Sequence, residues 1–370
     1  MHETLGTGIE ITKNFRNPEG RRYAVIEGNQ GCNRSCGYCD VPSHYNAETE
    51  LTVAETCKTV DWLYDQGYRV LSYLGGEPLA PAPFVTKEGK TFARHTLEVV
   101  EHAKKNGMLV NVTTNGDFIN PSQPEVIEAL ARVGLDSLTF SLHTYTRAGL
   151  DHLLSASRLA ARQRIIPTIQ TVMTSQTVDK LPGIAAAAAE NGTLFSTGIV
   201  QTKGDDFSKE QDFSVIPTEE QQERTFRALR ALKSFGFVRN NRNYLNHGTE
   251  FYPNNWHCDA EKDTFIKIGA GGKVNVCSQV ETGIRIEDIT TLDDQEWRDR
   301  KRIVVANCGN CLYHCYYESE NPNIIGDIPM IGVGLAIKTG RHLLAERWGQ
   351  TATTISKKQV PEVDWSLALR

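Results

Sequence analysis

Short apolar runs alternate with amphipathic segments along the first 200 residues of the chain. Runs rich in β-branched and aromatic residues that stop at glycine or polar residues are typical of buried strands, whereas apolar residues spaced three and four apart are typical of helices. Segment 52–66 illustrates the helical pattern, since Thr52 and Glu55 can form a capping box and Gly67 follows. We expect strands at 23–28, 69–74, 108–114, 136–142, 166–172 and 194–201, and helices at 52–66, 92–106, 124–133, 148–164 and 178–191.

This alternation predicts parallel βαβ units, which are too few to close an eight-unit barrel. We therefore expect an α/β fold in which residues 20–203 form a partial (β/α)6 barrel. Residues 204–250 are expected to be a helical linker, with one amphipathic helix at 218–235. Residues 251–320 hold five of the nine cysteines, so we expect a small Cys-rich C-terminal domain folded around metal, followed by a tail at 321–370.

Composition and charge exclude several classes of protein. Hydrophobic residues at 39% and charged residues at 23% are ordinary for a globular chain and argue against wholesale disorder. The net charge of −5 argues against a broad nucleic-acid-binding face. No apolar run reaches the roughly 18–20 residues of a membrane span, and no secretory signal begins the chain. We expect a cytoplasmic protein, although the apolar segment 324–348 with its basic end leaves peripheral lipid contact open.

The cysteines fall into two clusters, and the first lies in one loop after the first expected strand. It contains Cys32, Cys36 and Cys39. Clustered thiols in a chain without an export signal bind metal or perform redox chemistry more often than they form disulfides. Three thiolates suit a four-iron cluster with one open iron position, and the alternative is a zinc site completed by His44 or Asp40.

Four motifs occur in order at the ends of successive expected strands. They are Cys32-Asn33-Arg34-Ser35-Cys36-Gly37-Tyr38-Cys39, Gly75-Gly76-Glu77-Pro78-Leu79, Thr114-Asn115-Gly116 and Phe140-Ser141-Leu142. Together they resemble the motifs of the radical S-adenosylmethionine (radical SAM) superfamily, including the aromatic residue before the third cysteine. The resemblance covers roughly residues 20–200. One departure is His143, because many relatives have an aspartate after the Ser-Leu pair.

The resemblance implies a [4Fe-4S] cluster on the three cysteines, with S-adenosylmethionine chelated at its open iron and cleaved reductively to a 5′-deoxyadenosyl radical. It implies cofactor-binding residues Tyr38, Gly75, Gly76, Glu77, Pro78, Asn115, Ser141 and Gln170. The glycines permit close approach of backbone carbonyls, and Glu77 offers an acceptor near a cationic amino group. For Asn115, Ser141 and Gln170 the alternative is a turn or strand-end residue that satisfies local backbone groups.

The second cysteine cluster resembles the auxiliary-cluster extension called the twitch domain, a short relative of the SPASM domain. A hairpin is expected from 264–268 and 273–277, joined by a glycine-rich turn. The resemblance implies a second auxiliary [4Fe-4S] cluster held by Cys258, Cys277, Cys308 and Cys311, and zinc is the alternative metal. Cys315 is then an alternative ligand or a free thiol that donates a hydrogen atom. Cys57, on the apolar stripe of its helix, is expected to be a buried small hydrophobe.

The sequence says less about what is done with the radical. We expect hydrogen-atom abstraction from a small sugar-like or aminocyclitol-like molecule, with oxidation or epimerisation assisted by the auxiliary cluster. The alternatives are a peptide-modifying (RiPP) maturase and adenosyl transfer or carbon–carbon bond formation on a lipid. About 22 residues precede the first expected strand, which is short for a leader-peptide-binding domain. A reducing partner such as flavodoxin or ferredoxin is implied, and a two-cluster electron carrier or a zinc-binding interaction protein is the non-enzyme alternative.

Overall fold

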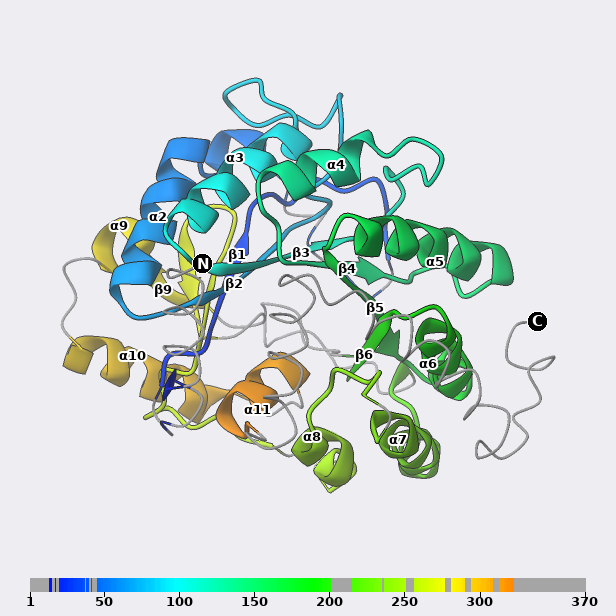
Figure 1. Cartoon of the computed structure of the whole chain (residues 1–370). Coiled ribbons are helices and arrows are strands. Elements are labelled where there is room, and N and C mark those ends of the chain that lie inside the picture. The colour runs from blue at the N-terminus through cyan, green and yellow to red at the C-terminus, as the bar shows by residue number, and fades with distance from the viewer. Residues whose placement is uncertain are drawn as a thin grey trace.

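The computed structural model describes residues 13–14, 17, 20–36, 38–39, 41, 45–200, 215–234, 236–250, 256–276, 281–289, 294–308 and 313–322. These residues form one nine-stranded sheet in the order β6-β5-β4-β3-β2-β1-β7-β8-β9 (Figure 1). The strands of the first half are β1 (Tyr23–Glu27), β2 (Val70–Leu74), β3 (Leu109–Thr114), β4 (Ser137–Ser141), β5 (Ile166–Met173) and β6 (Leu194–Ile199). Neighbours among these six pair in parallel, which confirms the open α/β arrangement of a partial barrel.

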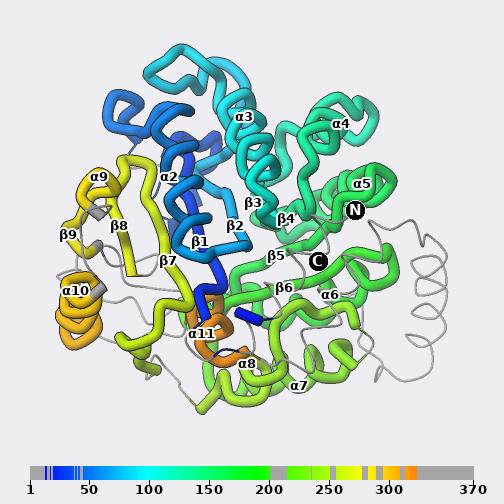
Figure 2. The backbone as a smooth tube through the Cα atoms, turned by 60° about the vertical axis from the view of Figure 1, so that its left-hand side comes forward, coloured from blue at the N-terminus to red at the C-terminus, as the bar shows by residue number. Residues whose placement is uncertain are grey.

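The helices between these strands lie on one side of the sheet in both Figure 1 and Figure 2. The first of them confirms its predicted cap, since the Thr52 side chain accepts from the Glu55 N–H and the Glu55 carboxylate accepts from Thr52. The described helices of this half are α2 (Val53–Asp65), α3 (Phe92–Lys105), α4 (Glu125–Arg132), α5 (Arg147–Arg162) and α6 (Leu181–Glu190), with 3-10 turns η2 (Ala47–Thr49) and η3 (Val178–Lys180).

The two faces of the sheet differ in chemistry. The face toward the helices is apolar, since Leu71 and Tyr73 of β2 belong to the buried hydrophobic core. The opposite, concave face carries a polar row across β2, β3 and β4. There Asn111 Nδ2 donates to Ser72 Oγ at 3.2 Å, while Ser137 Oγ donates to Asn111 Oδ1 at 2.7 Å. The concave face therefore suits a polar ligand better than an apolar one.

The second half of the chain adds strands to the free edge of β1. The predicted hairpin is present as β7 (Phe265–Ile268) and β8 (Lys273–Asn275), which pair antiparallel, and β9 (Glu281–Arg285) follows. β7 pairs in parallel with β1, so the hairpin continues the barrel sheet, as Figure 2 shows. The described helices of this half are α7 (Glu219–Lys233), α8 (Arg242–His247), α9 (Ile286–Ile289), α10 (Asp294–Asn307) and α11 (His314–Glu320).

Helix α11 lies against the concave side and bridges β6 and β7. At β6 a side-chain carbon on Gly198 would lie 2.2 Å from His314 Nδ1, so only glycine admits the imidazole. At β7 the rings of Phe265 and Tyr316 are 5.2 Å apart. Arg22, directly before β1, donates to the Ser319 carbonyl at 2.5 Å. The short helix thus links strands from both parts of the curved sheet. None of the helices in the described ranges is long and apolar enough to cross a membrane.

Candidate functional site

The loop that carries the first three cysteines leaves β1 and packs against the loop that follows β2. A side-chain carbon on Gly76 would lie 2.2 Å from the Gly31 carbonyl oxygen, and one on Gly75 would lie 2.5 Å from the Asn29 carbonyl oxygen. Both positions therefore require glycine for the backbone contact itself. The two glycines hold the chain entering Cys32 against the end of β2, which places the first motif beside the second.

Glu77 joins the ends of β2 and β3. Its Oε1 accepts from Thr114 Oγ1 at 2.6 Å and from the Leu79 N–H at 2.9 Å, and its Oε2 accepts from the Asn115 N–H at 2.7 Å. The residue is fully buried, and burial raises its carboxyl pKa to about 7 although these hydrogen bonds oppose the shift. The next residue, Pro78, offers its carbonyl to Thr96 Oγ1 of α3 at 2.7 Å. Three of the four carboxylate lone pairs of Glu77 are thus used by the protein.

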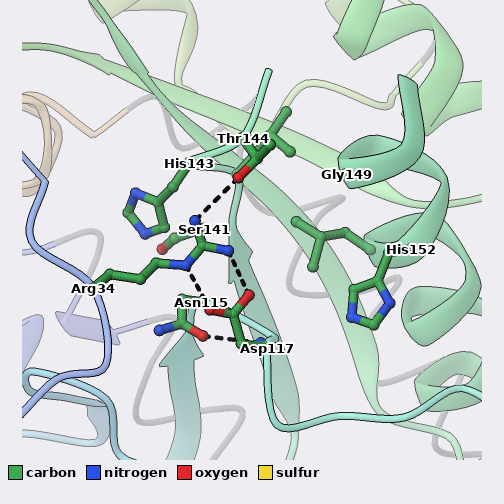
Figure 3. A pocket seen from close by; sticks show the side chains of 10 residues that line it. Arg34, Asn115, Asp117, Ser141, His143, Thr144, Gly149 and His152 are labelled. Atoms are coloured by element: carbon green, nitrogen blue, oxygen red, sulfur yellow. Dashed lines mark hydrogen bonds and ion pairs between the residues drawn. The ribbon is translucent and has the colours of Figure 1, made fainter. Parts of the chain in front are cut away.

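A second carboxylate fixes the cysteine loop from the other side, and we call this contact the loop clamp. Asp117 accepts from Arg34 through both carboxylate oxygens, with Arg34 Nε 2.6 Å from Oδ2, and from Asn33 Nδ2 at 2.8 Å. Arg34 also donates to Thr144 Oγ1 at 3.1 Å (Figure 3). Asn115 completes the clamp, because its Nδ2 donates to Asn33 Oδ1 at 2.8 Å and its Oδ1 accepts from the Asp117 N–H.

His143 connects the end of β4 to the third part of the cysteine motif. Its Nδ1 lies 2.9 Å from the Tyr38 hydroxyl and 3.4 Å from Cys36 Sγ. Burial lowers the pKa of His143 to about 4, and the positive charge of Arg34 acts in the same direction. A neutral imidazole can accept the Tyr38 proton at Nδ1. His143, where the sequence departs from the pattern that it resembles, therefore contacts the cysteine loop directly.

A cavity of about 340 Å³ opens between the ends of β3 and β4 and the start of α5. Its lining includes Asn115, Ser141, His143 and His152, together with Arg34 and Asp117 of the clamp (Figure 3). His152 Nε2 donates to the Gly116 carbonyl at 3.1 Å, which fixes one wall. Gln170 of β5 lies next to Ser141 in the parallel register, on the concave face. The cavity and this face together present polar groups at the carboxyl ends of the strands, where α/β sheets bind ligands.

The three thiols of the loop have the chemistry that iron–sulfur ligation requires. Cys32 and Cys36 are partly buried and Cys39 is exposed. Burial raises the thiol pKa values of Cys32 and Cys36, and nearby Arg34 opposes this at Cys36. In the described part of the chain, no three His, Cys, Asp or Glu side chains converge closely enough to hold one ion. A cluster does not demand that convergence, because each thiolate binds a different iron.

The remaining predicted ligands are only partly described. Cys258 precedes β7, Cys308 follows α10 and Cys315 lies in the first turn of α11, and all three thiols are partly exposed. Two further predicted ligands and the two alternative zinc ligands lie outside the described residues, and these are Cys277, Cys311, Asp40 and His44. Cys57 packs against the apolar core from α2, as predicted, although it is partly rather than fully buried.

Sequence reasoning did not assign functions to the clamp or to His143. The signal for the clamp was present, since Arg34 lies inside the first motif and Asp117 directly follows the third, with opposite charges. Their pairing depends on two loops that are 83 residues apart in sequence. Only the parallel order of the strands brings these loops to the same edge of the sheet.

Comparison with known proteins agrees with this geometry. Residues 26–175 match the model of the Radical SAM superfamily. The chain is 26% identical over 176 residues to a probable GTP 3′,8-cyclase of Methanopyrus kandleri, a match that covers 46% of this chain and 53% of that protein. It is 26% identical over 179 residues to the GTP 3′,8-cyclase of Chlorobaculum tepidum, with 48% and 46% covered. The matched part thus spans about half the length of these relatives.

A solved structure shows the same fold over a longer stretch. SuiB of Streptococcus suis bound to S-adenosylmethionine superposes with a TM-score of 0.53 at 15% sequence identity, covering 75% of this chain and 67% of that one. At this identity the likeness concerns the fold alone.

Proposed function

We propose that this chain is a radical SAM enzyme in which Cys32, Cys36 and Cys39 hold a [4Fe-4S] cluster that binds S-adenosylmethionine, because residues 26–175 match the Radical SAM superfamily model. When bound, these groups supply a 5′-deoxyadenosyl radical through reductive cleavage of the sulfonium. The observation that carries the proposal is the convergence of four sequence motifs at one edge of the sheet, where Glu77, the loop clamp and His143 hold the cysteine loop.

The chain's own residues have distinct roles in this proposal. Gly75 and Gly76 keep the loop against β2, and Tyr38 is oriented by its hydrogen bond with His143. Asn115 and Ser141 line the cavity and would contact polar groups of S-adenosylmethionine. Gln170 would extend this surface on the next strand. Glu77 and Pro78 would hold the loop after β2 in place through their hydrogen bonds with Asn115 and Thr96.

We further propose an auxiliary [4Fe-4S] cluster of SPASM/twitch type on residues 251–320, held by Cys258, Cys277, Cys308 and Cys311. The support is the hairpin β7–β8, whose second strand runs toward Cys277. Cys315 would be either an alternative ligand or a hydrogen-atom donor. Residues 20–203 would be the catalytic barrel, with 204–250 as linker and 321–370 as tail. The auxiliary region would work as an extension of the barrel, since its hairpin pairs with β1.

The substrate we propose is a small polar molecule, sugar-like or aminocyclitol-like, that is oxidised or epimerised after loss of a hydrogen atom. The polar row on the concave face supports this choice over a lipid substrate. A peptide substrate remains the second candidate, since a polar face also suits peptide groups. A cytoplasmic flavodoxin or ferredoxin would supply electrons, and neither nucleic acid nor a membrane is needed as a partner.

The proposal is tested by product analysis after oxygen-free reconstitution. The wild type, incubated with S-adenosylmethionine and dithionite, should form 5′-deoxyadenosine that mass spectrometry detects. The variant Cys32→Ala/Cys36→Ala/Cys39→Ala should form none, whereas Cys57→Ala, the matched control on α2, should retain activity.

Two further results bear on the cluster assignments. Iron content should fall from about eight to about four per chain in the triple variant, whereas zinc at the second site would remove the auxiliary cluster from the proposal. The radical SAM assignment fails if cluster-loaded wild type forms no product and S-adenosylmethionine does not change the spectrum of the reduced cluster.

A further inference from the structure

Three polar side chains meet on the concave face at the junction of the two halves of the sheet. Glu27 is the last residue of β1, Lys267 lies in β7 and Asn275 ends β8. In the register, Val25 pairs with Lys267, so Glu27, two residues further along β1, shares the face of Lys267. Asn275 lies directly opposite Lys267 in the antiparallel pair. Three strands thus direct one carboxylate, one ammonium and one amide to the same surface.

This surface is on the concave side of the sheet, away from the barrel helices. Phe265, two residues before Lys267 on β7, faces the same way and packs on Tyr316 of α11. The same side of the sheet carries the polar row of Ser72 and Asn111. Val25, which pairs with Lys267, also pairs with Ser72, and Ser72 pairs with Asn111. The three residues therefore face the interior of the partial barrel.

The carboxylate and the amide have unused hydrogen-bonding capacity. Lys267 Nζ lies 3.4 Å from Glu27 Oε2, and the two side chains are only 8% and 5% exposed. Glu27 Oε1 and Asn275 Oδ1 are buried, and no donor from the described residues reaches either atom. Asn111 on the same face provides the contrast, since its oxygen accepts from two hydroxyl groups. A buried acceptor without a donor costs stability, and a bound ligand that donates to it recovers that cost.

The position of the cluster relates it to both proposed iron–sulfur sites. Glu27 is five residues before Cys32, and the chain between them forms the start of the cysteine loop. Asn275 is two residues before Cys277. Glu27 ends β1 at the carboxyl edge, where parallel sheets bind ligands, whereas Lys267 and Asn275 lie two residues further from that edge, level with Val25, because β8 runs antiparallel to β7. A ligand that contacts them would lie between the catalytic loop and the auxiliary region.

We propose that Glu27, Lys267 and Asn275 anchor the substrate, and that the substrate is a polyol or amino sugar with adjacent hydroxyl or amino groups. One such group donates to Glu27 Oε1, a neighbouring one donates to Asn275 Oδ1, and Lys267 donates to a substrate oxygen. An apolar chain could not satisfy these atoms. These three residues thus define the substrate class, and the reaction carried out on the substrate rests on the proposed radical SAM function.

The test measures ligand binding separately from cofactor chemistry. Binding of myo-inositol and glucosamine to the cluster-loaded protein is followed by calorimetry, with the tripeptide Gly-Ser-Gly as comparator. We expect at least one of the two probes to bind the wild type, and Glu27→Gln to weaken that binding about tenfold, since an acceptor becomes a donor. Glu98→Gln is the matched control, because Glu98 pairs with Lys90 and Arg94 on the surface of α3.

A second variant addresses folding, since Glu27→Gln removes a carboxylate charge 3.4 Å from the buried Lys267 ammonium. Glu27→Gln/Lys267→Met removes both charges and should also lose probe binding, with a thermal unfolding curve that reports folding independently. The anchor is refuted if neither probe binds the wild type, if both variants bind as the wild type does, or if only the tripeptide binds. A wild type that binds a probe, forms no 5′-deoxyadenosine and shows no change in the spectrum of its reduced cluster with S-adenosylmethionine would instead refute the radical SAM function and leave the binding site intact.

Discussion

The loop clamp makes a quantitative prediction for Asp117→Ala. The substitution removes three accepted hydrogen bonds, two from Arg34 and one from Asn33, and leaves the backbone bond to Asn115 in place. Hydrogen bonds to charged groups contribute about 1.5–3 kcal/mol each when buried. The side chains of Arg34 and Asp117 are 27% and 28% exposed, so hydrogen bonds to water compensate for much of the lost stabilisation. We expect a loss of about 2 kcal/mol, or about thirtyfold in the equilibrium that orders the loop.

The assay is cluster release, because the loop carries the ligands. Wild type and variant are reconstituted without oxygen and challenged with a chelator, and the fading of cluster absorbance is followed in time. The amplitude that belongs to the first cluster is identified by its absence from the triple cysteine variant. Asp117→Ala should lose that amplitude about thirtyfold faster than the wild type, in proportion to the fraction of open loop.

Asp151→Ala is the matched control for the clamp. Asp151 also pairs with an arginine, Arg147, but both side chains are at least half exposed on α5. Exposed pairs of this kind contribute about 0–1 kcal/mol, so cluster release should match the wild type. Arg34→Lys should be intermediate, because a lysine keeps the charge and loses the bidentate geometry. Equal release rates for wild type and Asp117→Ala would refute the clamp as the element that orders the cysteine loop.

Three further changes test other contacts. Gly76→Ala should at least halve the iron bound at the first site, because the new carbon would lie 2.2 Å from a loop carbonyl, whereas Gly269→Ala, with its nearest atom at 3.6 Å, should not. Gly198→Ala should lower the free energy of unfolding by about 1–3 kcal/mol in urea titration, since the methyl group would lie 2.2 Å from the buried His314 ring. Burial raises the pKa of Glu50 from 4.5 to about 7, so the folded state retains a proton that the unfolded chain releases. Its contribution to stability therefore falls as pH rises from about 5 to about 7, by about 3 kcal/mol at most, and Glu50→Gln should flatten the urea-derived profile; unchanged slopes would contradict this.

The barrel strands and their helices were predictable because each carries its own local signal. The α2 cap, for example, requires only Thr52 and Glu55, and both bonds are present. Strand β3 ends where Asn115 and Gly116 turn the chain, and Gly116 adopts a φ of +78° that favours glycine. Such signals act over a few residues, so a sequence shows them directly.

The second half of the chain was predicted less completely because its stabilising contacts are polar and distant. Helix α10 has few apolar residues, and its buried positions include Lys301, which pairs with Asp263 at 3.5 Å. Trp297 on the same helix donates to that carboxylate at 2.9 Å. An apolar stripe does not reveal a buried lysine. Likewise, the hairpin pattern identifies β7 and β8 but contains no information on which strand of the barrel they join.

The site residues divide according to the hydrogen-bonding capacity that they retain. The sequence directs attention to Glu77, yet three protein donors use its carboxylate and it is fully buried. Asn115 similarly bonds Asn33 and Asp117. Ser141 and Gln170 differ, since neither side chain makes a hydrogen bond with another described residue, and both remain partly exposed. Ser141 and Gln170 therefore retain the capacity to form hydrogen bonds with a polar ligand. The carboxylate of Glu77 does not, because its hydrogen bonds hold the ends of β2 and β3 together.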